Sequence, residues 1–197
     1  MCGIIAAASN RNVGKLLVQG LHKMEYRGYD SAGIALHQNE QIAHLRTLGK
    51  VKLLEEKMIA EKPKSKLGIA HTRWATHGEP SEENAHPHKS NDRVYIVHNG
   101  IIENYLELKD YLKNQGYSFS SQTDSELIAH MLDFFLNQDN SMIDSMYLTI
   151  KKLDGAYAIA AVDKEDDKNI VLARSKSPLL IGIGTDEFLA ASDPLAI

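Results

Sequence analysis

MCGIIAAA, residues 1–8, places the only cysteine of the chain directly before an apolar run, Gly3 to Ala8, that favours a buried strand. Four further runs of this kind are AYAIAAV (156–162), NIVLA (169–173), LLIGIG (179–184) and FLAA (188–191), separated by Asp, Asn and Gly turns. Strands that are apolar at nearly every position are usually covered on both faces. Two packed sheets with helices outside them satisfy this requirement, so the sequence predicts an α+β fold.

The middle of the chain alternates between helical patterns and turns. Apolar residues recur at helical spacing in five segments, which predict helices near residues 13–24, 51–58, 105–112, 127–135 and 142–153. The segments IALHQ (34–38) and QIAHL (41–45) predict a hairpin. Thr123 and Glu126 predict a capping box, and Ser141 predicts another helix start. Residues 72–92 contain two prolines and three histidines and predict a long, functional loop.

Composition excludes several classes of protein. The 197 residues include 22 Lys and Arg against 26 Asp and Glu, with no basic stripe for a nucleic-acid backbone. No apolar run reaches the roughly 18 residues of a membrane helix, and residues 1–12 lack the charged start of a signal peptide. A single cysteine cannot form an internal disulfide, which fits a reducing cytosol. We therefore expect one cytoplasmic domain over residues 1–197, with no cofactor and no membrane partner.

The cysteine at position 2 has two interpretations. An initiator methionine is removed when the next residue is small, so loss of Met1 would leave Cys2 with a thiol and a free α-amine. That amine has a pKa of about 7.7–8.0 and can act as general base toward the thiol, through a water molecule. Cys2 would then be a nucleophile with its own base. Alternatively, it is an ordinary small residue of a buried strand.

His98-Asn99-Gly100 follows a predicted strand over Val94–Val97 and precedes a predicted helix. An Asn amide beside a Gly N–H offers two donors to one oxygen, as a tetrahedral oxyanion requires, and one such donor contributes ~3–4 kcal/mol. Taken alone, however, the Asn-Gly pair is more typical of a tight turn.

Two charged residues suit an amino-acid ligand. Arg73 ends a strand at the mouth of the long loop and could hold a carboxylate through two hydrogen bonds, although a surface salt bridge is commoner. Asp124, in the first turn of a predicted helix, is favoured there by the helix dipole and could also pair with an ammonium group. Histidines also gather, at positions 71, 77, 86, 88 and 98. No Cys pair accompanies them and their spacing matches no closed zinc site, so no metal is expected.

Longer motifs carry a resemblance to one family. MCGI at the start, EYRGYDSAG from Glu25, HTRWATHGEPSEENAHPH from His71, VHNGIIEN from Val97 and TDSE from Thr123 resemble the glutaminase domain of glutamine–fructose-6-phosphate aminotransferases. The resemblance continues through ARSKSPLLIG and ASDPLA and covers essentially the whole chain. That domain is an N-terminal-nucleophile hydrolase, so the resemblance implies a four-layer αββα sandwich with two largely antiparallel sheets.

The resemblance also implies site residues and partners. Its implied roles are Cys2 as nucleophile and base, Asn99 and Gly100 as oxyanion hole, Arg73 and Asp124 as ligands of the glutamine carboxylate and amine, Trp74, Thr76 and His77 in the closing loop, Arg27 and Gly28 as supports of the nucleophile, and His86 as a structural residue. L-Glutamine would give glutamate and ammonia, which a sugar-isomerase domain would deliver to fructose 6-phosphate. The full enzyme is expected to be a homodimer, and an excised domain could be monomeric.

Two alternatives stay open. The nearest is the glutaminase domain of another amidotransferase, of the phosphoribosylpyrophosphate amidotransferase or asparagine synthetase type. RGYDSAG and HTRWATHG favour the aminosugar branch over these. The other alternative is an amino-acid- or metal-binding module without catalysis.

Overall fold

A computed structural model describes residues 2–75 and 78–197 of the chain. Its helices and strands, in chain order, are β1 Gly3–Ser9, α1 Gly14–Lys23, β2 Ser31–Gln38, β3 Gln41–Leu48, α2 Val51–Glu61, β4 Leu67–Arg73, β5 His88–Ser90, β6 Val94–Ile102, α3 Tyr105–Asn114, α4 Glu126–Leu136, α5 Met142–Ile150, β7 Gly155–Asp163, β8 Val171–Ser175, β9 Leu180–Gly184 and β10 Glu187–Ala191, with short 3₁₀ turns at Glu25–Arg27 and Pro194–Ala196. None of the helices in these described ranges is both long and apolar enough to cross a lipid bilayer.

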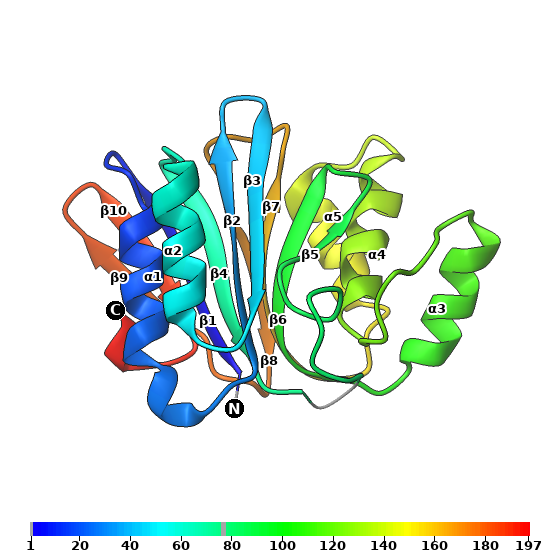
Figure 1. Cartoon of the computed structure of the whole chain (residues 1–197). Helices are drawn as coiled ribbons and strands as arrows, with labels where there is room; N and C mark the ends of the chain where they lie inside the picture. The colour runs from blue at the N-terminus through cyan, green and yellow to red at the C-terminus, as the bar shows by residue number, and fades with distance from the viewer. Residues whose placement is uncertain (1, 76–77) are drawn as a thin grey trace.

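Two sheets face each other at the centre of the molecule (Figure 1). The first has the strand order β3-β2-β4-β1-β10-β9, and the second has the order β5-β6-β7-β8. Every pairing between these named strands is antiparallel. Helices α1 and α2 cover the outer face of the first sheet (Figure 1), whereas α4 and α5 cover the second, and α3 packs against α4. The predicted α+β sandwich of two antiparallel sheets between helices is confirmed.

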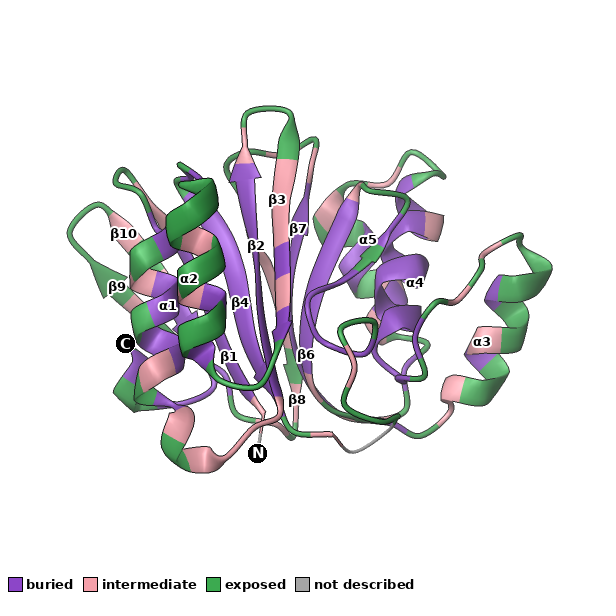
Figure 2. Cartoon of the chain, in the orientation of Figure 1, coloured by how far each residue is buried: buried purple, intermediate pink, exposed green. Residues whose placement is uncertain are grey.

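Strand β1 explains why the apolar runs are continuous. Its side chains alternate between two cores, because successive residues of a strand point to opposite faces. Ile5 and Ala7 pack in the core beneath α1 and α2. Ile4 and Ala6 belong to the core between the sheets, with residues of β6 and β7. A third core joins the second sheet to its helices. Most residues of β1, β2, β4, β6, β7 and α4 are buried by this layering, whereas α1, α2 and α3 keep an exposed face and β9 is largely exposed (Figure 2).

Local signals predicted several elements correctly. Strands β2 and β3 form the predicted hairpin, with Asn39 in the left-handed region at φ 53°. The Ser141 hydroxyl accepts a hydrogen bond from Asp144 N, as expected of a helix N-cap. The predicted loop over residues 72–92 is shorter than expected. Strand β4 extends into it as far as Arg73, and β5 forms at His88–Ser90.

The predicted capping box is wrong. Helix α4 begins at Glu126 with Ser125 as its N-cap, so Asp124 precedes the helix and does not lie in its first turn. The Glu126 carboxylate accepts hydrogen bonds from Ser120 and Ser121. Thr123 Oγ1 lies 3.0 Å from His88 Nε2. Glu126 therefore fixes the segment before the helix through residues five and six positions earlier, and Thr123 bonds to the distant His88, so the two residues do not cap the helix together.

Candidate functional site

A cavity of about 460 Å³ lies where β1, β4 and β6 come together. It is lined by Cys2, Arg27, Arg73, Trp74, His86, His98, Asn99, Gly100, Ile101, Thr123, Asp124, Ser125, Ser177 and Pro178. Its volume is within the range of roughly 300–1,000 Å³ that is usual for small-molecule sites. Cysteine, arginine, aspartate and an Asn-Gly pair from distant parts of the chain thus surround one small-molecule-sized space.

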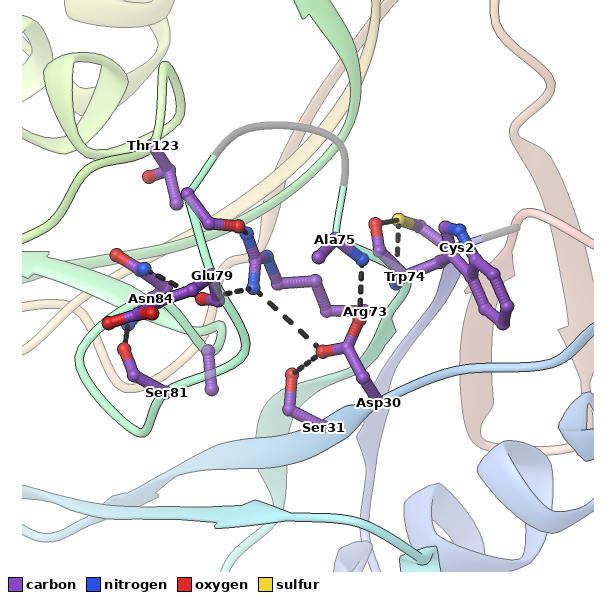
Figure 3. A network of polar contacts seen from close by, with 12 residues as sticks. Cys2, Asp30, Ser31, Arg73, Trp74, Ala75, Glu79, Ser81, Asn84 and Thr123 are labelled. Atoms are coloured by element: carbon purple, nitrogen blue, oxygen red, sulfur yellow. Dashed lines mark hydrogen bonds and ion pairs between the residues drawn. The ribbon is translucent and has the colours of Figure 1, made fainter.

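Cys2 lies at the edge of this cavity, directly before β1. Trp74 N donates to its Sγ at 3.3 Å, and Sγ lies 3.6 Å from Trp74 O. Figure 3 shows this pair of contacts beside the indole ring. Burial raises the pKa of the Cys2 thiol, and the hydrogen bond from Trp74 acts in the opposite direction. The thiol is therefore protonated at neutral pH and needs a base before it can attack a carbonyl carbon.

Asn99 and Gly100 lie inside β6, so the turn that the pair favours in isolation does not form. They pair with Ala158 and Tyr157 of β7. Gly100 has φ +135°, and a Cβ built there would lie 1.9 Å from Ala156 O, so only glycine fits. The Asn99 side chain crosses to the first sheet, where its Nδ2 donates to Cys2 O at 3.3 Å. The Asn-Gly pair thus stands beside the cysteine on a rigid strand.

Arg73 ends β4 and is 3% exposed, so it is not the surface salt bridge considered above. Its guanidinium donates to Gly78 O at 3.2 Å and to Glu79 O at 3.4 Å. It also lies 3.8 Å from Asp30 Oδ1, and the Asp30 carboxylate accepts from Ala75 N. Figure 3 shows Asp30 and Glu79 on either side of the guanidinium. Arg73 and Asp30 together hold the backbone on both sides of residues 76 and 77.

Asp124 is buried on the other side of the cavity. Its Oδ2 accepts from Ile102 N at 2.8 Å, which joins the segment before α4 to the last residue of β6. Ser125 Oγ lies 3.4 Å from Asp124 Oδ1 and 2.8 Å from His98 Nδ1. The carboxylate is therefore oriented by β6 and not by a helix terminus.

Trp74 forms an exposed part of the cavity rim, with 52% of its surface accessible. Its ring lies over Gly28, where a Cβ would approach a ring carbon to 3.0 Å and where φ is +74°. Arg27 lines the cavity next to this glycine and lies 3.6 Å from Asp193 Oδ2. The two remaining loop residues named above, Thr76 and His77, lie outside the described residues.

Four buried histidines gather at the cavity: His86 and His98 line it, and His71 and His88 pack against His86. The His86 ring packs between His71 and His88, at centroid distances of 4.1 and 4.5 Å. Burial lowers the pKa of His71 to about 3 and that of His98 to about 4, and it lowers the pKa of His86 well below its usual value. These rings are uncharged at neutral pH. Among residues 2–75 and 78–197, no group of three or more His, Cys, Asp or Glu is arranged to hold a metal ion.

Sequence reasoning missed several contributors to the site. Asp30, Ser125 and Ser177 received no role, although all three lie within the quoted motifs. His71 and His98 were considered only as metal ligands. The sequence signal for these residues was their place within the motifs, which does not show which segments come together around the cavity.

Comparison with known proteins agrees with the motifs. Residues 71–197 match the family described as the glutamine amidotransferase domain. The isomerizing glutamine–fructose-6-phosphate aminotransferases of Haemophilus ducreyi and Vibrio parahaemolyticus are each 51% identical to the chain over 198 aligned positions. These alignments cover 100% of this chain and 32% of each relative, so the chain spans about a third of their length.

A solved structure is also similar. Glutamine phosphoribosylpyrophosphate amidotransferase from Bacillus subtilis superposes with a TM-score of 0.85 at 27% identity, over 99% of this chain and 42% of that one. The resemblance drawn from the sequence motifs is confirmed. The individual roles that it implies for the site residues remain predictions.

Proposed function

This chain belongs to the glutamine amidotransferase domain family, and we propose that it hydrolyses L-glutamine to glutamate and ammonia through a thioester on Cys2. The observation that supports this most strongly is the shared cavity. The Cys2 thiol, the Asn99-Gly100 pair, Arg73 and Asp124 line one space of about 460 Å³. A nucleophile, two oxyanion donors and two charges complementary to an amino acid are the groups that amide hydrolysis of glutamine requires.

The reaction begins at the thiol. Once Met1 is removed, the Cys2 α-amine takes the thiol proton, and the sulfur attacks the side-chain amide carbon of glutamine. Negative charge moves to the amide oxygen, where Asn99 Nδ2 and Gly100 N donate to it. The C–N bond then breaks, and the proton on the α-amine passes to the departing nitrogen, which leaves as ammonia. Water hydrolyses the γ-glutamyl thioester, so that glutamate leaves and the thiol is restored.

Substrate recognition falls to the opposite wall of the cavity. Arg73 binds the α-carboxylate of glutamine and Asp124 binds its α-ammonium group. Trp74, together with Thr76 and His77, belongs to the segment that closes over glutamine. Arg27 and Gly28 support the nucleophile, and His86, packed between His71 and His88, is a structural residue of the cavity wall.

The whole protein would use the ammonia for biosynthesis. The relatives named above are isomerizing aminotransferases, and they extend well beyond this chain. We infer that residues 1–197 form one cytoplasmic glutaminase domain without a cofactor. A sugar-isomerase domain would receive its ammonia and convert fructose 6-phosphate to glucosamine 6-phosphate. The full enzyme would be a homodimer, and this domain alone could be a monomer.

Ammonia release from glutamine tests the proposal. Protein with an unblocked Cys2 should release ammonia, and Cys2→Ala should abolish that release while leaving the fold intact. Protein that retains Met1, verified by intact mass, should turn glutamine over very slowly, because its Cys2 nitrogen is locked in a peptide bond. Undiminished activity in either protein would refute the mechanism.

A second experiment separates the proposal from a non-catalytic module. A glutamine-mimicking diazoketone should alkylate Cys2, and glutamine should block this labelling, whereas chelators should not affect it. Stoichiometric zinc together with resistance to labelling would contradict an enzymatic function. Ammonia-dependent and glutamine-dependent aminosugar synthesis by the full-length protein would distinguish the aminosugar branch from the phosphoribosylpyrophosphate branch.

A further inference from the structure

The side chain of Asn99 can serve an oxyanion only in one of two orientations. A carboxamide has a donor end and an acceptor end of nearly the same shape, and rotation by about 180° exchanges them. With Nδ2 toward Cys2, the residue offers a proton to a developing negative charge. With Oδ1 toward Cys2, it would present a lone pair and repel that charge. Something beside Asn99 must therefore select the orientation.

His71 is placed to make this selection. Its Nε2 lies 2.9 Å from Asn99 Oδ1. The histidine is fully buried in β4, between Ile4 of β1 and Gly33 of β2 in the register of the first sheet. Asn99 belongs to β6 of the second sheet. The contact therefore connects the two sheets at the point where the nucleophile and its proposed oxyanion donors meet.

The charge state of His71 decides which atom donates. Burial lowers the pKa of His71 to about 3, so the ring is neutral at physiological pH and carries one proton. Because an amide oxygen can only accept, the proton must lie on Nε2 for this contact to be a hydrogen bond. Nδ2 then faces Cys2, whose carbonyl oxygen accepts from it at 3.3 Å. The reversed amide would set oxygen against oxygen at Cys2 and lose that bond. Nε2 could then accept from Nδ2 only if the ring proton moved to Nδ1, which is buried without a hydrogen-bond partner among the described residues.

We propose that His71 is a positioning residue that donates from Nε2 to Asn99 Oδ1 and thereby aims Asn99 Nδ2 at the oxyanion formed beside Cys2. This inference deepens the proposed glutaminase function and rests on it. His71 does not contact the substrate in this arrangement. Its effect passes through Asn99, so it should act on the chemical step and leave glutamine binding nearly unchanged.

The test compares two substitutions of the same length. His71→Gln keeps an N–H donor near Asn99 Oδ1, whereas His71→Met has a similar shape and no donor. We expect His71→Met to lower kcat for ammonia release about tenfold to hundredfold, because removing an oxyanion donor outright costs about 10²–10³. Its KM for glutamine should stay within about twofold of wild type. His71→Gln should recover most of kcat.

An inhibitor pair gives a readout that a packing defect would not reproduce. The γ-semialdehyde of glutamate adds to the thiol and forms a tetrahedral oxyanion, whereas glutamate itself does not. His71→Met should weaken binding of the aldehyde about as much as it lowers kcat and should leave glutamate binding unchanged. Equal weakening of both ligands would overturn the proposal.

His37 supplies the matched control. It is also a buried histidine of the first sheet with one ring hydrogen bond, from its Nε2 to Lys164 O at 2.8 Å. It lies at the hairpin end of β2, while Ser31 at the other end pairs with Arg73. His37→Met should lower the melting temperature without changing kcat. If His71→Met fails to fold, His71→Asn replaces it, because its shorter amide cannot reach Asn99.

The outcomes separate this inference from the function beneath it. Wild-type ammonia release by Cys2→Ala would refute the glutaminase mechanism itself. Loss of activity in Cys2→Ala, combined with wild-type kcat in His71→Met, would overturn only the role of His71. Equal losses in His71→Gln and His71→Met would also overturn it, because the retained N–H would then have no effect.

Discussion

The two walls of the cavity are built in different ways. On the reacting wall, Asn99 and Gly100 lie inside β6 and pair with β7, and Cys2 directly precedes β1. On the recognition wall, Arg73 and Asp124 are held by hydrogen bonds to backbone groups of neighbouring segments. Strand pairing positions the Asn-Gly pair of the first wall. On the second wall the Arg73 backbone ends β4 and pairs with Ser31, and individual side-chain contacts orient both charged groups.

This difference separates two kinds of sensitivity. A backbone inside a sheet has little freedom to adapt, so a change on the reacting wall should alter the rate of the chemical step or the fold itself. The charged side chains of the recognition wall are oriented by individual hydrogen bonds, each contributing about 1 kcal/mol. Changes there should mainly weaken glutamine binding, and the four predictions below test this division.

The largest effect is expected from Gly100→Ala. A Cβ at this position would lie 1.9 Å from Ala156 O, and φ is +135°, so β6 would have to separate from β7. We expect kcat to fall about 10³-fold, because the proposed oxyanion donors would move, and we expect a lower melting temperature. Gly116→Ala is the control, since Gly116 also has a positive φ of +92° but meets nothing within 4 Å. Gly116→Ala should retain full activity. Full activity in Gly100→Ala as well would show that catalysis does not require the conformation of β6 at this position.

Arg73→Lys probes the recognition wall. The planar guanidinium of Arg73 donates to Gly78 O and Glu79 O and has further N–H groups for a carboxylate. Lysine lacks this fork of donors. KM for glutamine should rise about 100-fold, with kcat changed only a few-fold. Arg93→Lys is the control. Arg93 pairs with Asp163 and Glu165 at the opposite end of β6, and its substitution should leave KM unchanged. A fall in kcat without a rise in KM for Arg73→Lys would contradict the division between the walls.

Acid should destabilise both walls together. His71, which contacts Asn99, and His88, which contacts Thr123, each have a pKa lowered to about 3 by burial. The unfolded chain protonates these residues near pH 6.5, and the native chain does not. Stability is therefore complete above pH 6.5 and decreases as the pH falls toward 3, with each histidine shifting the unfolding equilibrium about tenfold per pH unit.

Denaturant unfolding between pH 7 and pH 5 measures this effect. His71→Gln and His88→Gln should each reduce the proton uptake on unfolding by about one proton. Stability that is independent of pH across this interval would show that the histidines do not remain neutral in the folded protein.

The smallest effect is expected from Glu126→Gln. The carboxylate accepts from the backbone N–H groups of Ser120 and Ser121 and so fixes the segment before Asp124. The amide of glutamine has one acceptor oxygen where the carboxylate has two, so it can accept only part of these hydrogen bonds. KM should therefore rise about fivefold while kcat stays nearly constant. Glu107→Gln is the control, because Glu107 is also in the first turn of a helix but is exposed. Isothermal titration calorimetry with glutamate should likewise show weaker binding in Glu126→Gln than in Glu107→Gln.

The sequence predicted the elements whose signals are local. The hairpin of β2 and β3 and the cap at Ser141 follow from turn and capping residues a few positions apart. The apolar strand runs predicted the sandwich, since they require cover on both faces. The motifs around Cys2, Arg73 and Asp124 named these residues as candidates before their distances were known, and the structure brings them to one cavity.

The two local interpretations that are wrong share a cause. Asn99-Gly100 has the composition of a turn, yet pairing with β7 keeps it extended. Thr123 and Glu126 have the spacing of a capping box, yet their side chains bind His88 and the Ser120–Ser121 backbone instead. For Asn99-Gly100 and for Thr123 the partner is distant in sequence, and for Glu126 it lies five and six residues earlier, outside the spacing of the capping box.

Sequence alone therefore determined the family, the layered α+β fold and the chemical identity of the candidate groups, because apolar periodicity and contiguous motifs are written along one stretch of chain. Only the tertiary structure decided that Asn99 stands in a strand, that Asp124 is oriented by β6, and that His71 reaches Asn99 from the opposite sheet. Those arrangements depend on hydrogen bonds between segments far apart in the chain. Such bonds exist only after those distant segments have come together in the fold.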